Sequence, residues 1–299
     1  MAVEQEQAPG ERAEVPSPRS PRRQAKRPRV IPGFPLSFGV TVTMLSLIVL
    51  IPLVSIFWMS FRLSPADFWA TVTSQRVLAS YLVSFVTALV ASVINAGFGL
   101  LMAWVLTRYD FPGKRILDGL IELPFALPTA IAGISLTSLT VDGGWVGGLF
   151  SPLGIHIAYT WIGITVALVF VGSPFVVRSV QPVLESLDPQ FEEASQMLGA
   201  GRVYTFFHVI LPELAPALAT GFGMAFARCL GEYGSVIFIA GNKPYSTEIT
   251  PLLIMAQLQE FDYAQATAIA LVMLVAAFVI LFLMNVIQIR AARRTGSGR

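Results

Sequence analysis

Apolar residues gather into six long stretches along the chain, separated by short polar segments. A helix needs about 20 mostly apolar residues to cross the hydrocarbon core of a bilayer, and each stretch meets that length. The stretches lie at 38–61, 79–107, 118–140, 158–180, 209–240 and 264–289. This pattern predicts an all-α, polytopic membrane protein with six transmembrane helices.

Two of the six stretches are interrupted by charged residues or by proline. The third contains Glu122, followed by Pro124 and Pro128, and the fifth contains Arg228 and Glu232. Interrupted spans persist only where neighbouring helices or a wet cavity satisfy the polar groups. We therefore expect these two helices to line a pathway. For Glu122, a packing kink at the prolines is the competing interpretation.

Arg228 and Glu232 are four residues apart, so they share one helix face and can form an ion pair. Charges inside a membrane are costly and need a reason. One reason is that the two side chains neutralise each other and stabilise the bundle. The other is that Arg228 compensates the charge of an anion in transit. A dense arginine cluster is not expected in either case, because a deep energy well would trap the ion.

The composition agrees with a membrane protein, since 55% of the residues are hydrophobic and 13% are charged, against about 25% charged in soluble domains. An ordinary water-soluble enzyme is thereby excluded. Residues 1–35 mix Pro, Gln, Glu, Arg and Ser without apolar periodicity, which predicts a disordered basic tail. A juxtamembrane anchor on anionic lipid explains its basic run better than nucleic-acid binding does. Residues 36–290 are the expected transmembrane domain, and 291–299 the second tail.

Lys and Arg fall mainly on one side of the predicted spans. Sixteen of the 20 lie in the tails and in the second and fourth loops, and Arg178 is placed in the fourth loop. Arg62, Arg76 and Lys243 lie on the other side. Because loops rich in Lys and Arg stay in the cytoplasm, both termini are expected to be cytoplasmic.

No residues form a recognisable catalytic or metal-binding set. The single cysteine, Cys229, and the two histidines, His156 and His208, match no metal-ligand spacing. The sequence contains no Gly-x-x-x-x-Gly-Lys-Ser/Thr phosphate loop and no plausible Ser/His/Asp or Cys/His arrangement. We expect a non-catalytic chain with no metal or cofactor of its own.

The segment 188–212 has the pattern of a surface helix in a cytoplasmic loop. Asp188 can cap the helix, Pro189 suits its first turn, and Gly199 and Gly201 end it. One face is apolar, formed by Phe191, Ala194, Met197 and Leu198. An interfacial helix on lipid is one interpretation. The helix is acidic and its apolar face is small, so it matches anionic lipid poorly and fits a groove on a cytoplasmic partner protein better.

This segment resembles the EAA loop of importer-type ABC permeases, whose pattern is Glu-Ala-Ala, then Gly, then Ile-x-Leu-Pro. The spacing is met in full, and Ser195 and Val209 are the two departures. In that family the loop forms coupling helices that dock into the ATP-hydrolysing subunit. The resemblance implies an ATPase-coupling loop at Glu193, Ala194, Ser195, Gly199, Leu211 and Pro212.

Residues 228–242, followed by 247–254, resemble the fifth-helix region of sulfate and molybdate permeases. Their sequence is most similar to that of the T-type subunits of sulfate/thiosulfate importers. The resemblance implies a type I ABC importer permease fold that moves sulfate or thiosulfate across the bacterial inner membrane by alternating access. A molybdate or tungstate permease is the alternative within the family. An ATP-independent secondary anion transporter is the alternative outside it, but it predicts broken helices repeated in both halves, and no such repeat is seen.

The resemblance also implies partners. These are two ATPase subunits that bind the ATP, a second and non-identical permease, a periplasmic sulfate-binding protein and the lipid bilayer, with no role for nucleic acid.

Overall fold

The computed structural model describes residues 34–294, which form helices and connecting loops with no strand in that range. The chain divides into two units at Leu50. The described part of the first consists of α1 (Phe34–Leu45) and the π-helical turn η1 (Ser46–Leu50), whose side chains are almost all exposed. The predicted tail at 1–35 lies outside the described residues except for its last two positions, which begin α1.

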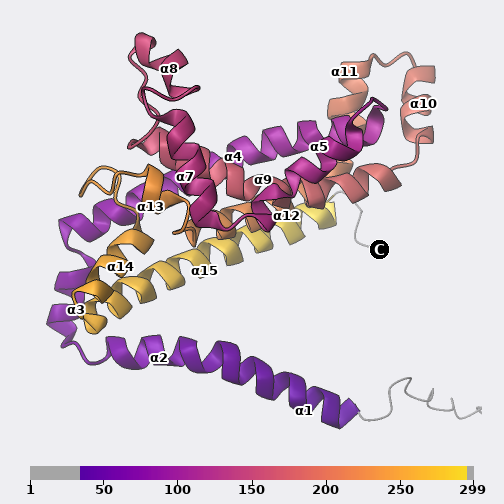
Figure 1. Ribbon diagram of the computed structural model, residues 1–299. Helices are drawn as coiled ribbons and strands as arrows, with labels where there is room; N and C mark the ends of the chain where they lie inside the picture. The colour runs from indigo at the N-terminus through magenta and orange to yellow at the C-terminus, as the bar shows by residue number, and fades with distance from the viewer. Residues whose placement is uncertain (1–33, 295–299) are drawn as a thin grey trace, which may run out of the picture. The chain divides into compact units, whose positions relative to one another are not determined.

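The second unit contains the remaining helices (Figure 1). They are α2 (Ile51–Ser60), α3 (Pro65–Val72), α4 (Gln75–Arg108), α5 (Lys114–Ile121), α6 (Leu123–Ala126), α7 (Thr129–Thr140), α8 (Gly147–Phe150), η2 (Ser151–Leu153), α9 (Trp161–Ser186), α10 (Gln190–Met197), α11 (Arg202–Thr205), η3 (Phe206–Ile210), α12 (Leu211–Leu230), α13 (Val236–Ile239), α14 (Thr250–Gln259) and α15 (Tyr263–Arg294). α15 therefore extends four residues into the expected tail at 291–299, of which 295–299 are not described.

Five helical stretches in the described range are long and apolar enough to cross a membrane: Leu36–Ser60, Gln75–Arg108, Trp161–Ser186, Arg202–Leu230 and Tyr263–Val286. The all-α membrane architecture is confirmed. The third expected span, 118–140, is divided into α5, α6 and α7, because Pro124 and Pro128 cannot donate the backbone hydrogen bonds that a continuous helix needs. The fifth span was expected to reach residue 240, but its helix ends at Leu230 and resumes only briefly as α13.

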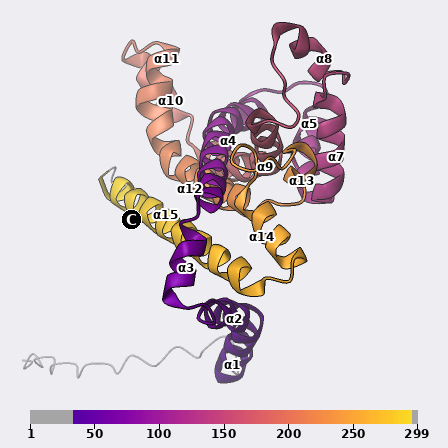
Figure 2. The same cartoon turned by 90° about the vertical axis from the view of Figure 1, so that its left-hand side faces the viewer.

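The core of the second unit is formed by α4, α9 and α12, which lie side by side in Figures 1 and 2 and pack against one another along their length. Val176 of α9 is fully buried between Gly99 of α4 and Gly221 of α12. A Cβ at Gly99 would lie 2.6 Å from Val176 Cγ1, and a Cβ at Gly221 would lie 2.8 Å from Val176 Cα. Small residues thus let the three backbones approach closely, as is typical of helix packing in membranes.

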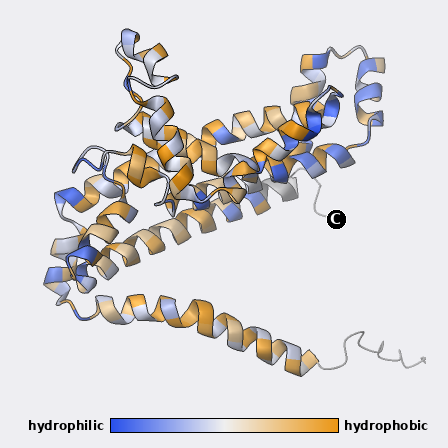
Figure 3. Cartoon of the chain, in the orientation of Figure 1, coloured by the Kyte–Doolittle hydropathy of each residue, from blue (hydrophilic) through white to orange (hydrophobic). Residues whose placement is uncertain are grey.

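Polar residues gather at the two ends of this bundle (Figure 3). One end carries α10 and α11, and the opposite end carries α3 and α14 (Figure 1). Between them the spans are predominantly apolar. This distribution places the surface helix α10 beyond the end of the membrane-spanning helices, where a partner from the aqueous phase can reach it.

Candidate functional site

Local interactions define both ends of α10 as the sequence predicts. At its start, the Asp188 carboxylate accepts a hydrogen bond from the Gln190 amide at 2.9 Å. At its end, Gly199 has a φ of +83°, its N–H donates to the Gln196 carbonyl, and the next amide donates to the Ser195 carbonyl. This pair of bonds is the Schellman arrangement, which needs a residue that tolerates the left-handed conformation. Gly199 therefore ends the helix by its backbone geometry.

Two side-chain contacts attach α10 to the rest of the bundle. The buried Ser195 hydroxyl lies 2.9 Å from the Thr205 hydroxyl of α11, so the serine that departs from the EAA pattern has a specific partner. Glu192 forms an ion pair with Arg108 at the end of α4. Arg108 in turn stands over the ring of Trp104, 5.6 Å from its centroid. These contacts join α10 to both α4 and α11.

The outward face of α10 is uncovered. Phe191 is 58% exposed, and Met197 and Leu198 are each 89% exposed. Exposed apolar groups of this size on one helix face are typical of a surface that binds another protein. Glu193 and Ala194 are exposed on the same helix. Four of the six predicted coupling residues, Glu193 to Ser195 and Gly199, therefore belong to one short surface element.

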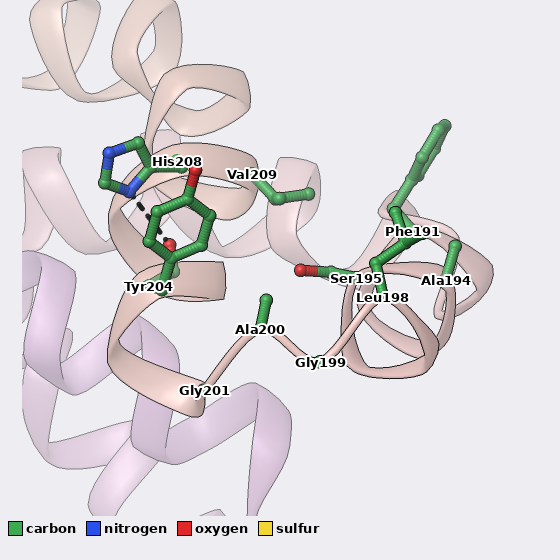
Figure 4. A pocket seen from close by; sticks show the side chains of 10 residues that line it. All are labelled: Phe191, Ala194, Ser195, Leu198, Gly199, Ala200, Gly201, Tyr204, His208 and Val209. Atoms are coloured by element: carbon green, nitrogen blue, oxygen red, sulfur yellow. Dashed lines mark hydrogen bonds between the residues drawn. The ribbon is translucent and has the colours of Figure 1, made fainter.

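An open pocket of about 780 Å³ lies between α10 and the segment that follows it (Figure 4). Residues of α10 form one wall, Tyr204 and His208 form the other, and Gly199 to Gly201 connect them. The two rings are stacked, with centroids 4.0 Å apart. Leu211 and Pro212 do not line this pocket; they form the first turn of α12, directly after η3.

Arg228 and Glu232 form the ion pair that their spacing predicts, with 2.5 Å between Nη1 and Oε2. Glu232 is buried, and its Oε1 accepts hydrogen bonds from the amide and the hydroxyl of Ser235, each at 2.9 Å. The carboxylate thus holds the chain where α12 ends and α13 has not yet begun. The Arg228 side chain remains 34% exposed, so its guanidinium has an accessible side.

Glu122 lies between α5 and α6 and forms an ion pair with Arg178, 2.7 Å from Oε1 to Nη2. Arg178 also binds Asp118 at 2.8 Å. Arg178 lies within α9, which continues as a helix to Ser186. Its placement in the fourth loop was therefore wrong. Glu122 and Arg228 have separate partners, and the structure records no contact that brings them together.

A further ion pair that sequence reasoning missed lies at the other end of α4. Arg76 at the start of α4 binds Glu248 through two hydrogen bonds of 2.6 and 2.7 Å, and Glu248 is 1% exposed. The two residues are 172 positions apart, so no local spacing could have indicated the pair. The available signal was an acidic residue within the Thr247-Glu248-Ile249 part of the second resemblance block.

Comparison with known proteins identifies the family. Residues 95–297 match the family described as "Binding-protein-dependent transport system inner membrane component". The chain is 52% identical to the sulfate transport system permease protein CysT of Salmonella typhimurium and 51% identical to that of Escherichia coli, in each case over 89% of this chain and 96% of the relative. It is 42% identical to CysT of Synechocystis over 90% of this chain and 94% of the relative.

Solved structures agree on the fold. A chain of a bacterial ABC transporter involved in the import of the polysaccharide alginate superimposes with a TM-score of 0.71 at 17% identity, covering 86% of this chain and 96% of that one. A second alginate transporter structure, in complex with a substrate-bound periplasmic protein, gives a TM-score of 0.69 at 19% identity over 87% and 93% of the two chains. At this identity the likeness establishes a shared permease fold. The chain belongs to the family of binding-protein-dependent transport system inner membrane components.

Proposed function

We propose that this chain is a membrane-spanning permease subunit of an ATP-binding-cassette importer for sulfate and thiosulfate. The substrate is supported by identity of 52% across nearly the whole length of a sulfate permease. ATP is bound and hydrolysed by a partner, and this chain contributes neither a catalytic group nor a cofactor. Both termini are cytoplasmic, and the assembly includes two ATPase subunits, a second and non-identical permease, and a periplasmic sulfate-binding protein.

The observation that carries the coupling role is the combination of an exposed apolar face on α10 with firm attachments behind it. The exposed face, including Leu198, docks into a groove of the ATPase. Closure of the ATPase dimer then moves α10. The Glu192–Arg108 contact transmits this movement to α4, which belongs to the core of the bundle. The Ser195–Thr205 contact transmits it to α11, which leads through η3 into α12. The translocation pathway between the two permease subunits opens alternately to the two sides of the membrane as a result.

The broken helices supply the polar part of the pathway in this proposal. Arg228 presents a partly exposed guanidinium to the passing anion, while its buried partner Glu232 keeps the local charge near zero. Such a site attracts a dianion without holding it too tightly to leave. Glu122, in the break between α5 and α6, shares Arg178 with Asp118, and this group of two carboxylates and one guanidinium offers no free positive charge that would hold an anion.

Uptake of radiolabelled sulfate tests the substrate. Cells that lack their own sulfate permease would receive this chain together with its neighbouring transporter genes, with and without an equimolar amount of molybdate. We expect uptake that depends on this chain and on ATP and that survives molybdate. Uptake that molybdate abolishes would contradict the assignment and favour a molybdate or tungstate permease. Uptake that continues without ATP would indicate a secondary transporter.

A further inference from the structure

A second hollow lies on the opposite flank of the coupling segment. It is a groove of about 370 Å³ between α4 and the α11–η3 segment. Its α4 wall consists of residues three or four apart on one helix face, and its second wall comes from α11 and η3: Gly97, Leu100, Leu101 and Trp104, then Arg202, Val203, Phe206 and Phe207. Arg202 is the one charged residue among them.

The walls of this groove are apolar and uncovered. Leu101 is 58% exposed, Val203 72% and Phe207 56%. A Cβ built on Gly97 would meet no atom within 4 Å, so there is open space in front of its backbone. The groove can therefore accept an apolar chain without any movement of α4.

Arg202 is exposed and makes no side-chain hydrogen bond or ion pair with any residue in the range 34–294. Arg108 and Arg178 are paired, with Glu192 and with Asp118 and Glu122 respectively, and the exposed Arg115 does not line the groove, so Arg202 is the free guanidinium at its wall. An unpaired guanidinium beside an apolar groove is complementary to a ligand with a negative head and an apolar tail.

The position of the groove matches the boundary of the membrane. Arg202 begins one candidate span, and Trp104 lies four residues before the end of another. Tryptophan is enriched where spans meet the headgroup region. In the orientation proposed above, this boundary faces the cytoplasmic leaflet, which carries the anionic lipids.

We propose that an anionic phospholipid binds this groove, with an acyl chain along Gly97 and Leu101 and its phosphate at Arg202. Trp104 packs edge-on against Phe206, with ring centroids 5.3 Å apart, and this contact joins α4 to η3 directly behind the coupling helix. A lipid in the groove stabilises this contact between α4 and η3. The proposal depends on the proposed orientation but not on which anion is transported.

Native mass spectrometry of the full-length chain in detergent, titrated with dioleoyl-phosphatidylglycerol or dioleoyl-phosphatidylcholine, tests the site. Gly97→Leu places a side chain in the groove from a position where a Cβ meets no atom within 4 Å, and Arg202→Gln removes the charge. Gly119→Leu, at another glycine with open space around it, and Arg115→Gln, at another exposed arginine of the same end, are the matched controls.

The wild type and both controls should retain one phosphatidylglycerol in preference to phosphatidylcholine. Gly97→Leu should lose this retention, and Arg202→Gln should bind phosphatidylglycerol about fivefold more weakly, as expected for one basic residue at a membrane surface. Equal binding by all variants, or equal retention of the two lipids by the wild type, would overturn the proposal. So would a Gly97→Leu chain that, when expressed together with the second permease, keeps its lipid but no longer co-purifies with that subunit, since the groove would then be a protein interface. Lipid binding is measured without transport, so a wrong substrate would leave this result unchanged.

Discussion

Replacing Gly199 by valine is expected to remove most ATP-driven sulfate uptake while the chain still reaches the membrane. Gly199 has a φ of +83°, and no atom lies within 4 Å of a Cβ built there, so the effect comes from the backbone conformation and not from a clash. A branched residue in this region costs about 2 kcal/mol, which corresponds to a roughly thirtyfold shift in a local equilibrium. Uptake should fall by at least about tenfold, because the end of α10 no longer holds its position.

A graded series makes this prediction specific. Gly199→Asn should transport well, because asparagine tolerates the left-handed conformation better than other residues do. Gly119→Val is the matched control, since Gly119 lies in α5 with open space around it and without a positive φ. Full uptake by Gly199→Val, or equal losses in the asparagine and valine variants, would show that the helix end does not act through its backbone geometry.

The second large effect is expected at the intramembrane ion pair. Glu232→Gln leaves the Arg228 charge without its partner, and Arg228→Gln leaves a buried carboxylate without its partner. Removal of one member of a buried pair costs about 3 kcal/mol. Both single variants should therefore be much less stable than the wild type. The double variant Arg228→Gln, Glu232→Gln should regain stability, because an amide oxygen can still accept the hydrogen bonds from Ser235.

Transport by the double variant separates the two interpretations of the pair. We expect it to accumulate normally in the membrane but to take up sulfate about tenfold more slowly, the effect of losing one charge-assisted hydrogen bond to the anion. Thermal aggregation in detergent reports stability, and initial uptake rates report transport. Wild-type uptake by the double variant would mean that Arg228 and Glu232 only stabilise the bundle.

Local signals account for the parts of this fold and site that the sequence predicted. Asp188, Pro189 and Gly199 act within one or two turns of α10, so their residue types were sufficient to place that helix. The pairing of Arg228 with Glu232 followed from helix periodicity alone. The third span was expected to be interrupted at Glu122, Pro124 and Pro128, and its breaks fall at these residues, although its division into three helices was not predicted.

Contacts between distant segments could not be predicted in this way. The Arg76–Glu248 pair joins the start of α4 to the segment just before α14, which only the tertiary fold brings together. The partner of Glu122 was missed because Arg178 lies on α9, a separate segment of the chain, and no local spacing relates the two residues. The partner of Ser195 also depended on how α11 turns back, which the two glycines permit but do not dictate.

Site-directed cross-linking from α10 tests the central claim most directly. The chain has one cysteine, Cys229, which is buried, so Leu198→Cys adds a single accessible thiol at a position that is 89% exposed. Leu149→Cys, in α8 and 73% exposed, is the control. After labelling of the permease with a photoreactive maleimide before the ATPase is added, and illumination of the assembled transporter, we predict a covalent adduct with the ATPase subunit from position 198 and none from position 149. An assembled, transport-competent complex that gives no ATPase adduct from position 198 would contradict the account.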